Sequence, residues 1–341
     1  MNASADIKAC RSMLRSGSRT FFLASLLLPR RISEAAAALY AFCRLADDTV
    51  DEGSSPPGHI SQLRERLHNA YEGRPLAVAV DRAFAQVVAQ YAIPRALPEA
   101  LLEGFEWDAA GRRYETLAEL HAYAARVAGS VGAMMSVLMG VRDAQVVARA
   151  SELGIAMQLS NIARDVGEDA RAGRLYLPRQ WLREAGIDPD VWLAKPQFSA
   201  ALAGVIQRLL HSADILYRQA ASGVTALPLA CRPGIHVSRL LYAEIGNELQ
   251  RRGLDSVSYR AIVPWSRKLT MLGFAMLATL RAETCSATPA IDAARFLVEA
   301  ASALSPHAIA GASFTRRFDD RVAWLVDLFQ RLERRDREER A

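Results

Sequence analysis

Apolar residues recur every three to four positions along most of this chain, which is the period of a helix with one buried face. Within residues 33–51, for example, Leu39, Phe42 and Ala46 fall on one side of a helical projection, and Ser33 is a typical N-cap residue. No run alternates with a period of two for long enough to predict a sheet. The pattern therefore predicts an all-α protein.

Prolines and glycines divide the pattern into segments. No proline lies between positions 99 and 177, which leaves room for three long helices. The sequence predicts helices over residues 33–51, 61–72, 78–91, 97–109, 116–138, 143–168, 199–222, 234–252, 265–283, 288–303 and 315–337. Residues 51–58 are predicted as a loop and residues 176–181 as a turn. Because no repeat and no long linker interrupts the series, we predict one helical domain over residues 1–341, with a charged tail at about 330–341.

Composition and charge exclude several classes of protein. The chain is 51% hydrophobic and 23% charged, as expected of a globular protein that buries a large core. The 42 Lys and Arg residues against 37 Asp and Glu give a formal charge of +5, which is too small an excess to predict nucleic-acid binding. Nearly all of the basic residues are arginines, which suit phosphate oxygens, although a genomic bias toward arginine explains the excess equally well.

The remaining signals concern cellular location and metal chemistry. The four cysteines form no CxxC pair, and no HExxH motif is present, so we expect reduced thiols and no zinc site. No apolar run reaches the length of a membrane span. The apolar run 21–28 is followed at once by Arg30 and Arg31 and has no cleavage site, so it is not a signal peptide. We expect a cytoplasmic protein, with contact to the inner face of the membrane left open.

Two acidic motifs carry the candidate chemistry. Asp47 and Asp51 are four residues apart near the end of a predicted helix, where two like charges repel each other and the helix dipole disfavours them. By itself such a cluster is most often a solvated surface. A second pair, Asp165 and Asp169, has the same spacing, with Asn161 one turn earlier.

The second motif forms a polar stripe of amide and carboxylate oxygens that begins at Gln158, while apolar residues occupy the opposite side of the helix. Such oxygens are the ligands of hard divalent cations, and Mg²⁺ in particular uses one or two carboxylates together with substrate phosphates. Two facing DxxxD helices would hold metal ions bridged by a diphosphate. Arg44 and Arg164 accompany the motifs, either as local ion pairs or as a clamp on diphosphate oxygens.

At these residues the chain resembles the trans head-to-head prenyl synthases, the squalene and phytoene synthase family. The segments SRTFFLASLLLP (18–29), YAFCRLADDTVD (40–51), YAARVAGSVG (123–132), QLSNIARDVGEDARAGRLYLP (158–178) and RLLYAEIGNEL (239–249) carry the resemblance. The first two look most like bacterial phytoene synthases. The resemblance implies a helical bundle of the isoprenoid synthase type around a central hydrophobic cavity.

The resemblance also implies roles for individual residues. It places Mg²⁺, with Mn²⁺ as a substitute, on Asp47, Asp51, Asn161, Asp165 and Asp169. The catalytic set is the four aspartates of the two motifs together with Arg44. The expected contacts to the substrate are Ser18, Arg19, Thr20, Phe21, Tyr40, Arg44, Tyr123, Gln158, Arg164, Tyr242 and Arg260. Arg126 stands where the family commonly has an aromatic or small residue, so its charge must point away from the cavity or be paired.

The implied activity is a prenyl transfer of carotenoid biosynthesis: two geranylgeranyl diphosphates condense through prephytoene diphosphate to phytoene, without NADPH. The nearest alternative is the same chemistry on farnesyl diphosphate, giving squalene, dehydrosqualene or presqualene diphosphate. A non-catalytic helical binding or assembly factor, or a scaffold in which the two motifs are accidental, are further alternatives. The very apolar product would favour a surface contact with membrane, and the oligomeric state is left open.

Overall fold

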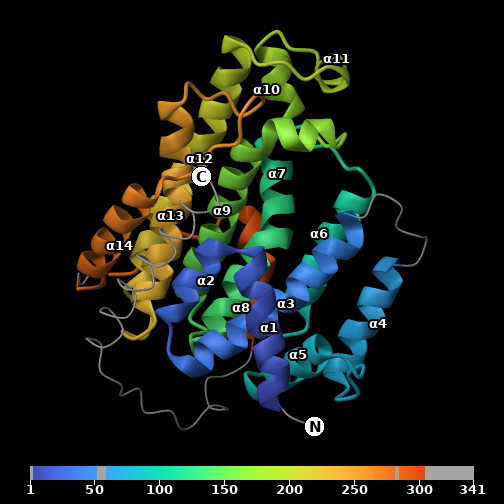
Figure 1. Cartoon of the computed structure of the whole chain (residues 1–341), viewed down its shortest axis with the longest axis vertical. Helices are drawn as coiled ribbons and strands as arrows, with labels where there is room; N and C mark the ends of the chain where they lie inside the picture. Colours follow the sequence, from blue (N-terminus) through green and yellow to red (C-terminus); the bar gives the residue numbers. More distant parts are fainter. Residues whose placement is uncertain (1–2, 52–58, 281–283, 304–341) are drawn as a thin grey trace, which may run out of the picture.

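The computed structural model describes residues 3–51, 59–280 and 284–303, and of residues 46–51 and 59 it describes the backbone. Every regular element in these ranges is a helix (Figure 1). The α-helices are α1 (Ala3–Gly17), α2 (Arg19–Leu26), α3 (Arg30–Asp51), α4 (His59–Tyr71), α5 (Ala79–Gln90), α6 (Ala96–Ala109), α7 (Leu117–Ala124), α8 (Ser130–Leu138), α9 (Ala144–Arg171), α10 (Arg179–Glu184), α11 (Pro189–Ala194), α12 (Ala200–Val224), α13 (Arg232–Arg251), α14 (Trp265–Thr279) and α15 (Arg295–Ser302). A π-helical turn, η1 (Ala125–Gly129), joins α7 to α8, and a 3₁₀ turn, η2 (Asp292–Ala294), precedes α15.

The prediction of an all-α fold is confirmed, and most predicted helices agree with the observed ones to within a few residues. The predicted helix 116–138 is α7, η1 and α8 in succession, and the predicted helix 265–283 ends earlier, at Thr279. The predicted helix 288–303 was wrong at its start, because residues 284–291 have no regular secondary structure and η2 begins at Asp292. The predicted helix 315–337 and the charged tail lie outside the described residues.

Four helices were not predicted, namely α1, α2, α10 and α11. The apolar pattern of α1 is weak because one of its three buried residues is Asp6, whose carboxylate accepts hydrogen bonds of 2.8 and 2.6 Å from Arg82 on α5. The other three helices are only six to eight residues long, too short for a helical period to stand out.

Helix α9 is the centre of the bundle (Figure 1). It packs along α12 on one side and along η1 and α8 on the other, and it also contacts α13 and α15. Its contact with α8 and η1 is a contact between backbones: a Cβ added at Gly154 would lie 2.2 Å from the carbonyl oxygen of Ala128, and one added at Gly132 would lie 2.1 Å from that of Ala150. Glycine at these two positions therefore fixes how closely the helices approach.

Two groups of helices flank this centre. On one side α1, α3 and α5 pack together, and the rings of Phe42 and Phe84 stack with centroids 4.0 Å apart. On the other side α2, α13 and α14 share a smaller apolar cluster, which includes Leu23, Leu241 and Ala275. Helix α14 lies at the edge of the molecule, on the left in Figure 1. None of the described helices combines the length and the apolar character that a membrane crossing requires.

Candidate active site

A cavity of about 850 Å³ lies in the middle of the bundle, with walls from α2, α3, α6, α8, α9, α12 and α13. Its lining changes character along α9. Most lining residues near the end of α9 are polar or charged, among them Gln158, Asp165 and Asp169. Toward its start Val146, Ala150 and Leu153 are apolar, and Arg149 is the charged exception. At 1.5 Å per residue, the stripe from residue 146 to residue 169 is about 35 Å long. The cavity is thus an elongated pocket with one charged end.

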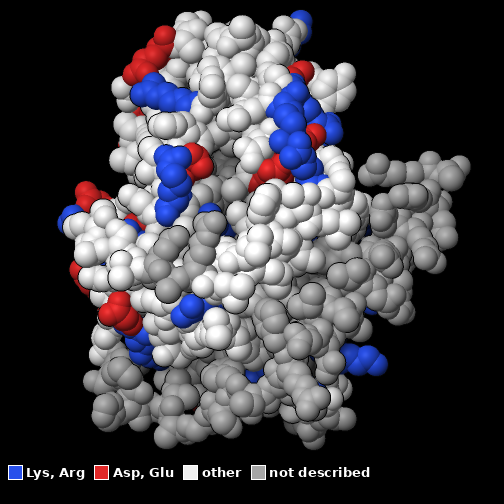
Figure 2. Space-filling model, turned by 90° about the vertical axis from the view of Figure 1, so that its left-hand side faces the viewer, with Lys and Arg blue, Asp and Glu red and all other residues white. Residues whose placement is uncertain are grey.

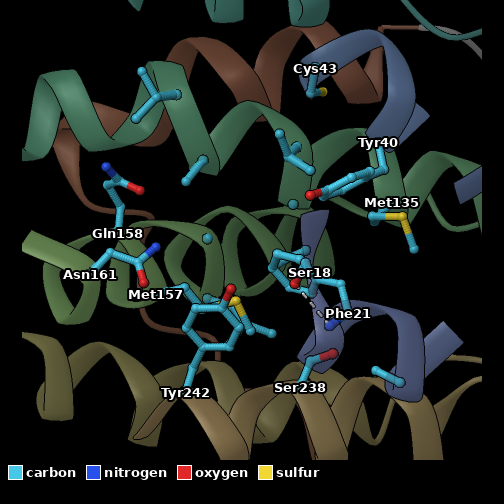
Figure 3. A pocket seen from close by; sticks show the side chains of 18 of the residues that line it. Ser18, Phe21, Tyr40, Cys43, Met135, Met157, Gln158, Asn161, Ser238 and Tyr242 are labelled. Atoms are coloured by element: carbon cyan, nitrogen blue, oxygen red, sulfur yellow. Dashed lines mark hydrogen bonds between the residues drawn. The ribbon is translucent and has the colours of Figure 1, made fainter. Parts of the chain in front are cut away.

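The polar stripe predicted from the sequence faces this cavity. Gln158, Asn161, Asp165 and Asp169 all line it, and Figure 3 shows Gln158 and Asn161 beside each other at one end of the pocket. The Oδ1 atom of Asn161 is buried and has no hydrogen-bond partner among the described residues. A buried acceptor without a donor costs free energy, so this oxygen is suited to a ligand that the chain itself does not supply.

Two arginines hold Asp165. Arg164 donates to both carboxylate oxygens, at 2.8 and 2.6 Å, and Arg260 donates to the Oδ1 atom at 2.9 Å. Arg260 comes from the segment that follows α13, and it also lies 3.4 Å from Glu168. The charged end of the cavity therefore combines carboxylates with guanidinium groups, which bind carboxylate and phosphate oxygens alike.

Asp169 lies close to several other carboxylates. Its burial, together with the nearby carboxylates of Asp165 and Glu168, raises the pKa of Asp169 to about 7, against the opposing effect of Arg174 at 3.7 Å. Asp108 on α6 also faces this end of the cavity and adds to the effect. A divalent cation relieves such crowding, because it favours the ionised form of every carboxylate around it.

Asp108 is held by two tyrosines. The hydroxyls of Tyr123 and Tyr176 each donate to one of its carboxylate oxygens, both at 2.8 Å, and the two rings stack with centroids 5.2 Å apart. Burial raises the pKa of Tyr123 well above its ordinary value, so its hydroxyl keeps its proton and remains a donor. Tyr123, predicted to contact substrate, thus lines the cavity and orients a carboxylate there.

An aromatic group forms the wall opposite α9. The ring of Phe21 stacks on Tyr242 at 5.1 Å and meets Tyr40 edge-on at 6.5 Å (Figure 3). Ser18 caps α2 by accepting from the backbone N–H of Phe21 at 3.2 Å, and it also lines the cavity. A Cβ at Gly17 would lie 2.3 Å from the Tyr40 hydroxyl, so only glycine leaves room for this ring.

The remaining predicted residues divide into three groups. Arg44 lines the cavity from α3. Arg19 is exposed and Thr20 half-buried, and neither is among the residues that line the cavity. Asp47 and Asp51 lie in the last two turns of α3, but their side chains are outside the described part of the structure.

Arg126 pairs away from the cavity, as its charge required. Its Nε lies 2.9 Å from Glu103, and its guanidinium stacks over Trp107 at 4.2 Å.

The oxygen ligands at the charged end fit Mg²⁺ in kind. Asn161, Asp165 and Asp169 offer amide and carboxylate oxygens only, which is the ligand type of a hard cation. Among the side chains that the structure describes, however, no three carboxylates, histidines or cysteines converge as a complete metal site. The described side chains of the second motif therefore offer oxygen ligands without forming a complete metal site.

Four charged residues that line the cavity are absent from the predicted site, namely Asp108, Arg149, Glu168 and Arg174. Glu168 and Arg174 lie within or just after the second motif, so their position already indicated them. Asp108 has no such signal, because it stands alone on the predicted helix 97–109, which lies between the two motifs in the sequence.

An all-helical bundle around an elongated apolar cavity with an acidic, arginine-rich end is the architecture of the isoprenoid synthases. Residues 14–269 match the squalene/phytoene synthase family, and the chain belongs to this family.

Similar proteins agree with this assignment. The chain is 50% identical over 325 residues to a phytoene synthase of Cereibacter sphaeroides, covering 90% of each sequence. It is 50% identical over 296 residues to a phytoene synthase of Rhodobacter capsulatus, covering 86% of this chain and 87% of that one. The crystal structure of a dehydrosqualene synthase matches with a TM-score of 0.74 at 30% identity, over 81% of this chain and 96% of that chain.

Proposed function

We propose that this protein is a phytoene synthase, a prenyltransferase that condenses two geranylgeranyl diphosphates head-to-head through prephytoene diphosphate. The observation that carries the proposal is the cavity along α9, which passes from carboxylates and arginines at one end to mainly apolar residues at the other. Such a cavity accommodates both parts of a prenyl diphosphate. The identity to bacterial phytoene synthases supports the particular reaction.

We propose that Mg²⁺ is held by Asn161, Asp165 and Asp169 together with Asp47 and Asp51. When bound, Mg²⁺ would neutralise the negative charge that develops on a departing diphosphate. Arg44, Arg164 and Arg260 supply guanidinium N–H donors for the diphosphate oxygens, since all three line the cavity. Asn161 offers the buried oxygen that has no other partner among the described residues.

The rest of the cavity protects the carbocation that remains. The apolar walls from α8, α9 and α12 exclude water, which would otherwise capture the cation as an alcohol. Phe21, Tyr40 and Tyr242 present aromatic faces, whose quadrupole stabilises positive charge. Burial raises the pKa of Tyr242 to about 12, so this phenol stays neutral and does not act as a competing nucleophile.

The test of this function is product analysis with Mg²⁺ and either geranylgeranyl or farnesyl diphosphate, with and without NADPH. We expect a C40 product from the longer substrate, in the same amount whether or not NADPH is present. A C30 product made only from farnesyl diphosphate would instead assign the protein to the alternative, a synthase that uses farnesyl diphosphate. The structural match to a dehydrosqualene synthase favours this alternative. No product from either substrate would contradict the proposal.

A set of variants tests the site itself. Asp165→Asn and Asp169→Asn should each lower turnover by about 10²-fold or more, because each removes a ligand charge at the reacting end. Arg44→Ala should lower kcat/KM through diphosphate binding. Asp214→Asn is the matched control, since this carboxylate is 56% exposed on α12 and pairs with Arg218 one turn away. Wild-type activity in Asp165→Asn would remove the second motif from the mechanism.

We also propose that the protein works in the cytoplasm and touches the inner face of the membrane. The support is chemical: phytoene is a hydrocarbon, and its transfer to lipid is strongly favoured over its release into water.

A further inference from the structure

The outer side of α14 exposes large apolar side chains. Leu269, Phe274, Leu277 and Leu280 are 41%, 54%, 62% and 81% exposed, respectively. Their spacing of three to five residues places them along one side of the helix and its C-cap. The opposite side of α14 packs on α13 and buries Ala275. Because a helix that is apolar on both sides is normally buried on both, the exposed side of α14 is expected to contact a further partner.

The segment that leads into α14 extends this apolar area. Tyr259 and Ile262 are 70% and 57% exposed, and they flank Arg260, which lines the cavity and pairs with Asp165. We call Tyr259, Ile262, Leu269, Phe274, Leu277 and Leu280 the α14 surface. They are six of the twelve large apolar side chains exposed on the described residues, so the exposure is concentrated rather than scattered. The α14 surface therefore begins beside the charged end of the cavity.

Charge on this segment has one sign. Residues 259–280 contain three basic residues, Arg260, Arg267 and Lys268, and no Asp or Glu. Arg267 is half exposed, and its nearest carboxylate oxygen, on Glu244, is 4.0 Å away. On the face of the molecule that carries α14, Figure 2 shows a broad uncharged area with charged side chains at its margins. Apolar side chains bordered by cationic ones match a layer of anionic headgroups over hydrocarbon.

We propose that the α14 surface docks the protein on a lipid bilayer that contains anionic phospholipid. Phe274, Leu277 and Leu280 enter the boundary between headgroups and acyl chains, and Arg267 and Lys268 bind the phosphates. Tyr259 lies at the headgroup level, where its amphipathic ring is favoured. Because the α14 surface adjoins Arg260, docking brings the charged end of the cavity close to the membrane. The choice of a bilayer as partner rests on the proposed function, since a hydrocarbon product has to be delivered to lipid.

The experiment is flotation of the full-length protein with vesicles of phosphatidylglycerol and phosphatidylethanolamine, and with vesicles of phosphatidylcholine alone. The test variant is Phe274→Asp/Leu277→Asp, and Arg267→Gln/Lys268→Gln tests the basic border. Val191→Asp is the matched control, because Val191 is 72% exposed but lies on α11. We expect the wild type and the control to float with the anionic vesicles. The apolar variant should bind at least tenfold more weakly, and the basic variant should bind equally weakly to both vesicle types.

Each outcome separates this proposal from the proposed function. Product formation in detergent solution is measured in parallel, and circular dichroism confirms that the variants are folded. If the apolar variant no longer floats with the anionic vesicles but forms product at the wild-type rate in detergent solution, the result supports the docking surface. Flotation of the apolar variant at the wild-type level overturns it, even if phytoene is made. A wild type that does not float but sediments as a dimer, with the apolar variant monomeric, also overturns it and assigns the α14 surface to a second copy.

Discussion

The contact between η1 and α9 makes a sharp prediction about a single methyl group. In Gly154→Ala the new Cβ would lie 2.2 Å from the carbonyl oxygen of Ala128 and 2.9 Å from the backbone nitrogen of Gly129. Ordinary contacts of a Cβ begin at 3.4 Å. The two helices would therefore have to move roughly 1 Å apart, because the obstacle is backbone and no side chain can rotate away.

The expected size of the effect follows from two opposing terms. Overpacking of a close contact costs about 1–3 kcal/mol, and a backbone obstacle places this site at the upper end. Alanine is the better helix former by about 1 kcal/mol, which offsets part of this cost. The net loss in the free energy of unfolding is therefore about 2 kcal/mol. In a protein of 341 residues that loss lowers Tm by about 3 °C.

The same substitution on α12 supplies the control. Gly204 lies in the interior of that helix, and a Cβ there would meet nothing within 4 Å. Gly204→Ala should raise the free energy of unfolding by up to about 1 kcal/mol, through propensity alone. Thermal and urea unfolding of both variants measure the difference. A Gly154→Ala protein at least as stable as the wild type would refute the argument that backbone contact sets the spacing of η1 and α9.

Three further predictions concern buried polar groups. Burial raises the pKa of Glu152 to about 7, so its stabilising contribution is present below pH 4.5 and is lost as the pH rises. Between pH 4.5 and 8, urea unfolding should show the free energy of unfolding of the wild type fall by about 3 kcal/mol relative to that of Glu152→Gln. Burial lowers the pKa of His236 to about 4, so the stabilising contribution of its neutral ring is present above pH 6.5 and is lost on acidification. From pH 6.5 to 5 the free energy of unfolding of the wild type should fall by about 2 kcal/mol relative to that of His236→Leu. Equal losses in the two proteins would contradict the lowered pKa. Asp108→Ala should lower the free energy of unfolding by about 2–4 kcal/mol, because it leaves two tyrosine hydroxyls without their acceptor. The same substitution should cost much less in a Tyr123→Phe/Tyr176→Phe background. Equal costs in the two backgrounds would show that the carboxylate stabilises the protein through other contacts.

Local patterns were enough to predict the long helices and the polar stripe of the second motif. Helix α9 illustrates why: its apolar residues recur at helical spacing, and Gln158, Asn161, Asp165 and Asp169 fall on one side of any helix that contains them. Helix α1 illustrates the limit. This helix is stabilised partly by the ion pair between Asp6 and Arg82, which lies 76 residues away in the sequence. No local pattern predicts such a pair.

The sequence by itself determined the fold class, the family resemblance and the candidate oxygen ligands, because helical periodicity and motif spacing are properties of neighbouring residues. Tertiary structure decided which of the candidate residues share the cavity and which further residues join them. It brought Asp108 from α6 to the charged end of α9, placed Arg260 there beside Asp165, and left Arg19 outside. The packing of α14 likewise decided which of its apolar residues stay exposed. Positions that depend on how distant helices cross are set by three-dimensional packing, which spacing along one chain does not encode.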